Sequence, residues 1–208
     1  LTGKKGLERI MNFVDTQNPK MKGLFSYKSS KYGRIFSPDE IGKYSTKIKS
    51  VCDSIVNSEG IVLIYSQWLD SGLIPMALAL EEMGFTRAIG NSLFENSSVS
   101  PVDFMSMKTK EESESESFSP VKYAFITGDP RLSPNNVDEI NLLTGENNVN
   151  GKMAKVVLIS KAASEGIDLK NIRQVHILEP WYTMSRIEQI IGRAVRSFSH
   201  QKLPFEKR

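Results

Sequence analysis

Residues 61–84 read IVLIYSQWLDSGLIPMALALEEMG, and this stretch decides the fold of the chain. It begins with a continuous apolar run, IVLIY at 61–65, that is rich in β-branched residues. Such a run is typical of a strand that is buried on both faces. A polar turn follows at Ser66-Gln67-Trp68, and we expect a helix over about 73–83 that ends at Gly84. A strand, a polar turn and a helix in this order predict a parallel α/β unit.

The same alternation recurs along the chain. Apolar runs at 121–127, 155–159 and 174–179 predict further strands. Helix-start signatures occur at Ser37-Pro38 and Ser133-Pro134. Four to five strands alternating with helices predict an α/β fold: a doubly wound parallel sheet with helices on both faces, in a single domain over 37–204. In such a sheet the residues that end the strands share one rim, and these are Ser66, Gly128, Ser160 and Glu179.

Two segments lie outside this pattern. Residues 1–36 are basic, with six lysines, and irregular apart from a short helical turn near Leu7 to Phe13, so we expect them to be a lead-in or linker. Residues 95–119 are rich in Ser, Glu and Lys and include EESESE at 111–116, which is typical of a disordered, exposed insertion. A phosphorylated switch or a partner-binding tail is the alternative for this insertion. Since Leu1 is not an initiator residue, we expect the sequence to be part of a longer protein.

The composition limits the kinds of chemistry that the chain can carry. Cys52 is the only cysteine, so the sequence has neither an internal disulfide nor a cysteine-rich metal site, and we expect Cys52 to be packed in a helix face. Of the two histidines, His176 lies inside a predicted strand and His200 follows the last helix, so a Ser-His-Asp set is not indicated. No apolar run approaches the length of a membrane span, so we expect no membrane partner.

The charge of the chain is unevenly distributed. The formal net charge is +3, but residues 111–116 carry four acids, so removing them leaves +7 for the rest. Such an excess is compatible with a polyanionic partner and does not identify one.

The last predicted helix carries a pattern of its own. Residues 172–200 read IRQVHILEPWYTMSRIEQIIGRAVRSFSH, in which Ser185 can cap a helix over 186–198. Offsets of four and three residues place Gln189, Arg193 and Arg196 on one face. The opposite face holds an apolar stripe that we expect to be packed on the core: Ile187, Ile190, Ile191, Ala194, Val195 and Phe198. Two planar guanidinium groups suit recognition of phosphate, although a surface helix with two ordinary exposed arginines fits the same spacing.

A complete nucleotide site would also need a phosphate-binding loop. The Gly-Lys pairs at 3–4 and 151–152 do not fit the pattern G-x-x-x-x-G-K-[ST], and the sequence has no DExD or DExH tetrad. An arginine-bearing face without a nucleotide cradle suggests half of a composite site.

Three segments resemble motifs of the second RecA-like lobe of superfamily 2 helicases and translocases, in the same order and at similar spacing. They are IVLIYSQW at 61–68 for motif IV, VVLISKAASEGIDL at 156–169 for motif V and EQIIGRAVR at 188–196 for motif VI. The chain is also similar to the helicase-like NTPases of large cytoplasmic DNA viruses, the group that includes the poxvirus nucleoside triphosphatase and the early-transcription-factor helicase subunit. The resemblance covers about 37–204 apart from the acidic insertion.

This resemblance implies a RecA-like fold and a set of functions. ATP and Mg²⁺ would be bound mainly by a first, N-terminal RecA-like lobe to which residues 1–36 lead. The polymer would be DNA or RNA, the further partner would be viral transcription machinery, and the location would be the cytoplasm, in a viral factory or a virion. Hydrolysis would drive movement along the nucleic acid or its remodelling.

The resemblance also implies roles for individual residues. Arg196 would be an arginine finger on the γ-phosphate, with Arg193 beside it and Gln189 ordering the pair. Gly166 and Asp168 would face the nucleotide across the cleft. Four residues would contact the nucleic acid: Ser66, Gln67, Ser160 and Lys161.

Three rival interpretations remain open from the sequence. The chain could be a non-catalytic helicase-like binding module in a transcription complex, a duplex translocase or termination factor that moves without separating strands, or a generic Rossmann-like ligand domain. The choice between DNA and RNA is open as well.

Overall fold

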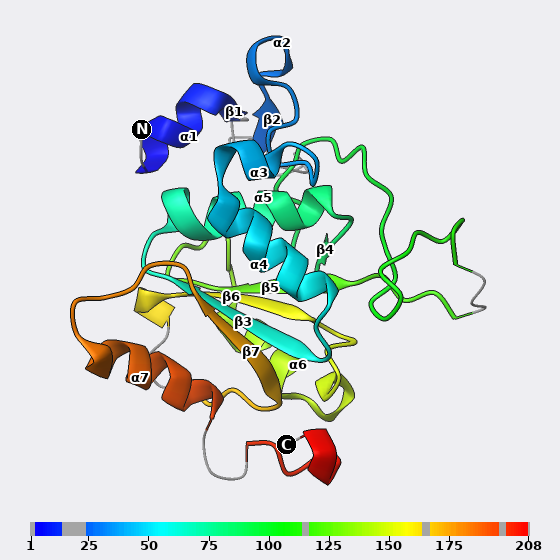
Figure 1. Ribbon diagram of the computed structural model, residues 1–208, viewed down its shortest axis with the longest axis vertical. Helices are drawn as coiled ribbons and strands as arrows, with labels where there is room; N and C mark the ends of the chain where they lie inside the picture. The colour runs from blue at the N-terminus through cyan, green and yellow to red at the C-terminus, as the bar shows by residue number, and fades with distance from the viewer. Residues whose placement is uncertain (1–2, 14–23, 114–116, 164–166, 196–198, 208) are drawn as a thin grey trace.

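The central sheet of the chain is parallel and lies between two layers of helices (Figure 1). A computed structural model describes residues 3–13, 24–113, 117–163, 167–195 and 199–207. Within these residues the sheet has five strands in the order β4-β5-β6-β3-β7. They are β3 (Ile61–Ser66), β4 (Thr86–Arg87), β5 (Lys122–Ile126), β6 (Val156–Ser160) and β7 (Ile172–Ile177). All pairs of neighbouring strands in this five-stranded sheet run parallel, so the predicted α/β sheet is confirmed. A separate antiparallel pair is formed by β1 (Met11–Phe13) and β2 (Phe25–Tyr27).

Alternate side chains of β3 enter two separate cores. Val62 and Ile64 face the core that α4 (Thr46–Val56) and α5 (Ile74–Glu82) cover. Leu63 and Tyr65 face the second core, which α6 (Asn136–Thr144) and α7 (Met184–Ala194) help to cover. Every residue of β3 is buried because the strand lies between β6 and β7 with helices on both sides. The expectation of helices on both faces is therefore confirmed.

Cys52 is packed in the α4 core, as the sequence predicted. Burial raises the pKa of its thiol to about 12, so the thiolate is scarce near neutral pH. Cys52 is thus a packing residue and not a nucleophile.

The three helix starts that were predicted from Ser37, Ser133 and Ser185 lie at other residues in the structure. Residues 37–40 form turns before the short α3 (Ile41–Tyr44), and α4 is capped by Ser45, whose Oγ accepts from the Ile48 N–H at 3.2 Å. Helix α6 is capped by Asn135, two residues after the expected Ser133. The Ser185 hydroxyl caps no N–H; it donates to Thr183 Oγ1 at 3.3 Å, and α7 already begins at Met184. In α4 and α6 the cap is the residue whose side chain reaches a free backbone N–H.

The N-terminal segment is part of the folded domain where the structure describes it. It forms α1 (Gly3–Ile10), β1 (Met11–Phe13), β2 (Phe25–Tyr27) and α2 (Ser29–Tyr32). Leu7, Met11 and Phe25 are buried in the same core as α5. The described part of 1–36 is therefore more regular than expected, because its apolar side chains complete that core. The expected helical turn near Leu7 to Phe13 lies partly in α1.

The acidic segment also contributes to the fold at its ends. Val102 is buried in the α5 core, and the carboxylate of Asp103 accepts from the backbone N–H groups of Met105, Ser106 and Ser119. Burial opposes this charge, but the backbone hydrogen bonds lower the pKa of Asp103 overall. The expected disorder over 95–119 does not hold for these residues; positions 114–116 lie outside the described part.

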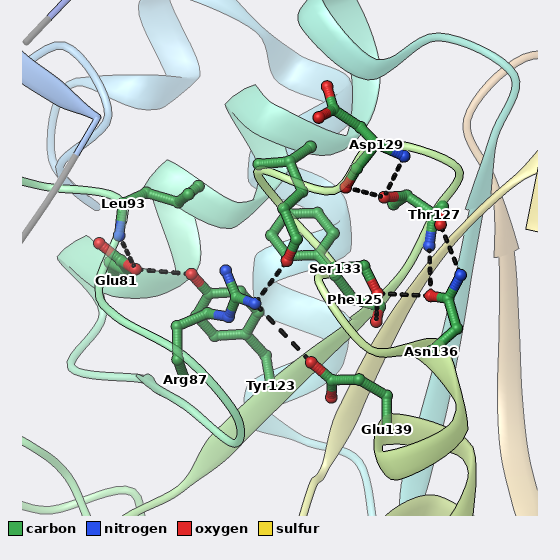
Figure 2. Close-up of polar contacts among 11 residues, drawn as sticks. Glu81, Arg87, Leu93, Tyr123, Phe125, Thr127, Asp129, Ser133, Asn136 and Glu139 are labelled. Atoms are coloured by element: carbon green, nitrogen blue, oxygen red, sulfur yellow. Dashed lines mark hydrogen bonds and ion pairs between the residues drawn. The ribbon is translucent and has the colours of Figure 1, made fainter. Parts of the chain in front are cut away.

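A buried ion pair joins the edge of the sheet to α6 (Figure 2). Arg87 Nη2 lies 3.7 Å from Glu139 Oε1 and donates to the Leu132 carbonyl at 2.7 Å. The Arg87 guanidinium also lies over the rings of Tyr123 and Phe125, at 5.5 and 4.9 Å from their centroids. Neither carboxylate oxygen of Glu139 has a hydrogen-bond partner among the described residues. Burial outweighs the attraction to Arg87 and raises the pKa of Glu139 to about 7.

This raised pKa predicts a pH dependence of stability with a definite sign. Between about pH 4.5 and 7, Glu139 holds a proton in the folded protein and loses it in the unfolded chain. Its contribution to stability is therefore fully present below pH 4.5 and is lost as the pH rises through 7. We expect wild type to lose on the order of 2 kcal/mol across this window relative to Glu139→Gln, measured by urea denaturation. The same change at exposed Glu206 should leave the pH slope unchanged, and parallel pH slopes for wild type and Glu139→Gln would contradict the assignment.

Candidate functional site

The carboxyl ends of β3, β5 and β6 surround a cleft of about 720 Å³. We call it the strand-end cleft, and it is lined by Gln67, Leu69, Gly128, Asp129, Pro130, Ser160, Lys161 and Ala162. Parallel strands end at the same edge of a sheet, which is why residues from three distant segments meet here. In Figure 1 this edge lies at the left, between α1 and α7. Three of the predicted site residues, Gln67, Ser160 and Lys161, are thus brought together.

Ser160 is the most unusual of the three. The residue is only 4% exposed, and its Oγ is buried without a hydrogen-bond partner among the described residues. An unsatisfied buried hydroxyl costs about 1–3 kcal/mol. A polar ligand that reached Ser160 in the cleft would remove this cost. Lys161, at the start of the 3₁₀ turn η3 (Lys161–Ala163), is exposed and supplies positive charge beside it.

The loop after β5 is held in place by side-chain hydrogen bonds (Figure 2). Asn136 donates from Nδ2 to the Thr127 carbonyl at 2.7 Å, and its Oδ1 accepts from the Thr127 N–H at 3.2 Å. Ser133 donates to the Phe125 carbonyl at 2.9 Å. These bonds fix Gly128 and Asp129 at the wall of the cleft.

The sequence placed Gly128 on the strand-end rim but assigned neither Gly128 nor Asp129 a contact with a ligand. A Cβ at Gly128 would lie 3.2 Å from Ala162 Cβ, so glycine permits the close approach of this loop to η3. The Arg131 guanidinium holds the pKa of Asp129 below its usual range. The Gly-Asp pair directly after a buried strand was the available sequence signal.

Ser66 does not contribute to the cleft surface. The residue is completely buried, and its hydroxyl donates to Glu179 Oε1 at 2.7 Å. Its Oγ also accepts from the Trp68 N–H at 3.0 Å. The structure therefore does not bring the Ser66 hydroxyl to the surface of the cleft, and its contact with nucleic acid stays a prediction.

Glu179 instead joins the ends of two neighbouring strands. Its Oε1 accepts from Ser66, and its Oε2 accepts from the Gln67 N–H at 3.2 Å. Gly72, in the π-helical turn η1 (Leu69–Leu73), packs on this bridge: a Cβ there would lie 2.1 Å from Ser66 Oγ. Glu179 thus fixes the backbone of Gln67, which lines the cleft.

The second group of predicted residues lies around a smaller cavity beside α7. This α7 pocket has a volume of about 270 Å³ and is lined by Tyr65, Lys161, Trp181, Thr183, Ser185, Arg186, Gln189, Ile190 and Arg193. Gln189 and Arg193 are brought together as predicted, one helical turn apart. Arg196 lies outside the described residues. Lys161 lines both the α7 pocket and the strand-end cleft, so a single residue connects the two cavities.

The remaining predicted residues lie in the loop after η3. Asp168 is exposed, between the buried Ile167 and Leu169. It does not line either cavity in the described part of the chain. Gly166 lies outside the described residues.

Helix α7 is attached to the core by fewer residues than its sequence suggested. Ile190 and Ala194 are buried, but Ile191 and Val195 are 41% and 64% exposed. The prediction that these two pack on the core is wrong, since they face away from it, and Phe198 lies outside the described residues. An exposed apolar strip on a helix is typical of a surface that another domain covers.

The histidines take structural positions. His176 is half-buried on β7, with Nε2 3.2 Å from Gln174 Oε1, and burial lowers its pKa. His200 contacts the Ile172 carbonyl through Nε2 at 2.7 Å. In the described part of the chain, no cluster of His, Cys, Asp or Glu could hold a metal ion. No helix within the described ranges is long and apolar enough to cross a membrane.

Comparisons with known proteins identify the family of the chain. The model of the family described as helicase conserved C-terminal domain matches residues 46–198. The chain is 34% identical over 175 residues to a termination factor NPH-I homolog of African swine fever virus, covering 79% of this chain and 24% of that protein. It is 31% identical over 183 residues to nucleoside triphosphatase I of Melanoplus sanguinipes entomopoxvirus, covering 88% of this chain and 23% of that protein. The chain thus spans about a quarter of the length of these relatives.

Proposed function

The chain belongs to the family of helicase conserved C-terminal domains, and on that premise we propose that it is the second motor lobe of a nucleic-acid-dependent ATPase. The observation that carries this proposal is the position of Lys161, which lines both the strand-end cleft and the α7 pocket. A motor must connect polymer binding to nucleotide hydrolysis, and a residue shared by two adjoining cavities provides such a connection.

The strand-end cleft is the proposed contact with DNA or RNA. Gln67, Ser160 and Lys161 offer an amide, an unsatisfied hydroxyl and a positive charge, all of which can bind backbone phosphates. Recognition of phosphates does not depend on base sequence, as a protein that moves along a polymer requires.

The α7 pocket is the proposed contact with ATP. Gln189 and Arg193 supply donors for phosphate oxygens, and its volume of about 270 Å³ suits only part of a nucleotide. Arg196 acts as the arginine finger that stabilises charge on the transferring phosphoryl group.

The rest of the nucleotide site lies in a first lobe. The sequence has no G-x-x-x-x-G-K-[ST] loop, and no acidic cluster suited to Mg²⁺ occurs in the described residues. ATP and Mg²⁺ are therefore held mainly by an N-terminal RecA-like lobe, and the exposed Ile191 and Val195 of α7 are a surface that this lobe can cover.

The proposed biological setting is supported by the name of one relative. One of them is named a termination factor homolog of a virus, which supports a role in viral transcription, in the cytoplasm of the infected cell or in the virion. A translocase that moves along a duplex without separating it would suit termination. A strand-displacement assay beside a triplex-displacement assay distinguishes the two kinds of motor.

The half-site proposal predicts the behaviour of the 208-residue chain by itself. We expect no measurable ATP hydrolysis and only weak ATP binding, because the chain has no phosphate loop. Labelled DNA or RNA should still bind, with an affinity that falls steeply as salt rises. Phosphate release measures ATP hydrolysis, and anisotropy of labelled oligonucleotides measures binding. Substantial ATP turnover by the purified chain would refute the proposal that the chain carries only half of the ATP site.

A non-catalytic binding module is the alternative. It would bind oligonucleotides in the same way, but the full-length protein would have no polymer-stimulated ATPase. A full-length sequence without a phosphate loop would also favour this alternative.

A further inference from the structure

Five basic side chains gather on the N-terminal helices, outside both cavities. They are Lys4, Lys5 and Arg9 on α1, Lys31 on α2 and Lys28 directly before α2, and we call them the basic cluster. In the described elements α1 and α2, the only acidic residue is Glu8, whose carboxylate lies 3.9 Å from Lys4 Nζ. Four of the five cations are exposed, and Lys28 is half-buried. The cluster therefore presents a net positive surface to solvent.

The two helices are in contact through these side chains. Lys28 Nζ donates to the Glu8 carbonyl at 2.5 Å, which joins the start of α2 to α1. Lys31 Nζ lies 5.3 Å from the centroid of the Tyr32 ring. Burial opposes ionisation of Tyr32, but Arg9 and Lys31 outweigh it and lower the pKa of its hydroxyl. Positive charge thus accumulates where the helices meet.

The segment that carries the basic cluster is packed on the hydrophobic core. Leu7 is 3% exposed, and Met11 and Phe25 are at most 2% exposed, all in the core that α5 shares. Tyr27 donates from its hydroxyl to Glu82 Oε1 of α5 at 2.7 Å. Since the backbone is already ordered, binding a ligand on this surface costs less conformational entropy than binding on a disordered tail.

The position of the cluster places it next to the strand-end cleft. Helix α1 packs against η1, and Leu69, the first residue of η1, lines that cleft. Figure 1 shows α1 on the same side of the sheet as the carboxyl ends of β3 and β6. A polymer lying in the cleft and extending past η1 therefore reaches the basic cluster.

We propose that the basic cluster binds the sugar–phosphate backbone of the DNA or RNA strand that occupies the strand-end cleft and extends the contact beyond it. The proposal rests on the proposed function. Exposed lysines and arginines are the groups that neutralise phosphates and release counterions, and here they outnumber Glu8, the acid of α1. An anionic membrane fits less well, because Leu7 is buried and α1 offers no exposed apolar face for insertion.

The test compares two variants with the same loss of charge. Lys4→Gln, Lys5→Gln and Arg9→Gln together remove three charges from the cluster. Lys108→Gln, Lys110→Gln and Lys152→Gln remove three exposed charges elsewhere; Lys152 precedes β6 and so lies toward the opposite ends of the strands. Anisotropy of labelled oligonucleotides is recorded over a range of salt concentrations for each protein. We expect the cluster variant to bind a long single strand at least about tenfold more weakly, with a salt slope smaller by about 2.

The length of the oligonucleotide separates the cluster from the cleft. A strand only long enough for the cleft should bind wild type and the cluster variant alike, whereas Lys161→Ala should weaken binding of both lengths. A second cluster variant, Lys28→Gln with Lys31→Gln, should reproduce the loss on the long strand, and thermal melting checks that each variant is folded.

The outcomes distinguish this proposal from the proposed function. If the cluster variants bind the long strand like the matched control while Lys161→Ala binds poorly, the cluster proposal is overturned and the proposed function stands. If wild type binds neither length, the proposed function fails and the cluster proposal with it. Cluster-dependent binding to anionic phospholipid vesicles, with none to oligonucleotides, would overturn the cluster proposal in favour of a membrane surface.

Discussion

Replacing Arg196 with alanine in the full-length protein is expected to lower ATP turnover at least about 100-fold, since arginine fingers contribute on the order of 10³–10⁵ in rate. The reason is that the variant lacks the positive, planar guanidinium that contacts the transferring phosphoryl group. In the transition state the charge of that phosphoryl group is spread over three oxygens. Oligonucleotide binding should remain close to that of wild type, because the residue acts on the nucleotide and not on the polymer. Steady-state phosphate release and oligonucleotide anisotropy measure the two effects.

Two controls sharpen this experiment. Arg196→Lys keeps the positive charge but removes the planar guanidinium with its paired donors. Its ATP turnover should therefore also be low if the finger depends on this planar geometry. Lys202→Ala removes a charge six residues further along the chain that pairs with Glu146 at the surface, and it should leave turnover unchanged. Turnover of Arg196→Ala within a few-fold of wild type would exclude the finger role.

Replacing Gly72 with alanine is expected to destabilise the domain by about 1–3 kcal/mol, as overpacking of a buried site does. The new Cβ would lie 2.1 Å from Ser66 Oγ and 3.1 Å from Glu179 Oε1, so the bridge between the ends of β3 and β7 must shift. Gln67, held by Glu179 through its backbone N–H, would move with it. Urea denaturation measures the loss of stability, and oligonucleotide binding should weaken as well.

Gly192→Ala provides the matched control. A Cβ at Gly192 meets nothing within 4 Å, and the residue lies inside α7. Alanine there should stabilise the fold by about 0.5–1 kcal/mol, because it restricts the unfolded chain and favours the helix. Equal stability of the Gly72→Ala and Gly192→Ala proteins would show that the Ser66–Glu179 bridge tolerates displacement.

The central strands could be predicted from sequence because their signal is local. Continuous β-branched runs at 61–65 and 155–159 became β3 and β6, which are buried on both faces. Strand β7 begins at Ile172 and not at 174, since it lies at the edge of the sheet, where half-exposed residues blur the pattern. The N-cap residues of the helices were predicted wrongly because several Ser and Asn residues lie near each helix start. The backbone geometry decides which of them reaches a free N–H.

The contribution of the N-terminal segment could not be predicted. A short helical turn near Leu7 to Phe13 was expected, and α1 covers part of it. That Leu7, Met11 and Phe25 pack in one core with α5, some fifty to seventy-five residues further along the chain, was not expected. When a side chain packs against a helix that is distant in sequence, the residues around that side chain do not indicate the contact.

The candidate site was predictable in part. Gln67, Ser160, Lys161, Gln189 and Arg193 lie on the two cavities at the strand ends because parallel strands bring their carboxyl ends together. The hydrogen bond between Ser66 and Glu179 could not be predicted, because the two residues are 113 positions apart and nothing in either segment indicates the pairing. The sharing of Lys161 between two cavities required the three-dimensional arrangement.

The most direct test of the central claim is ATP turnover of the full-length protein measured against increasing concentrations of DNA or RNA. We predict slow turnover without polymer and a saturable increase with at least one of the two. The increase should disappear in Lys161→Ala, whose residue lines both cavities. Turnover that is absent, or unchanged at saturating concentrations of both polymers, would contradict the assignment of this chain as the second lobe of a nucleic-acid-dependent ATPase.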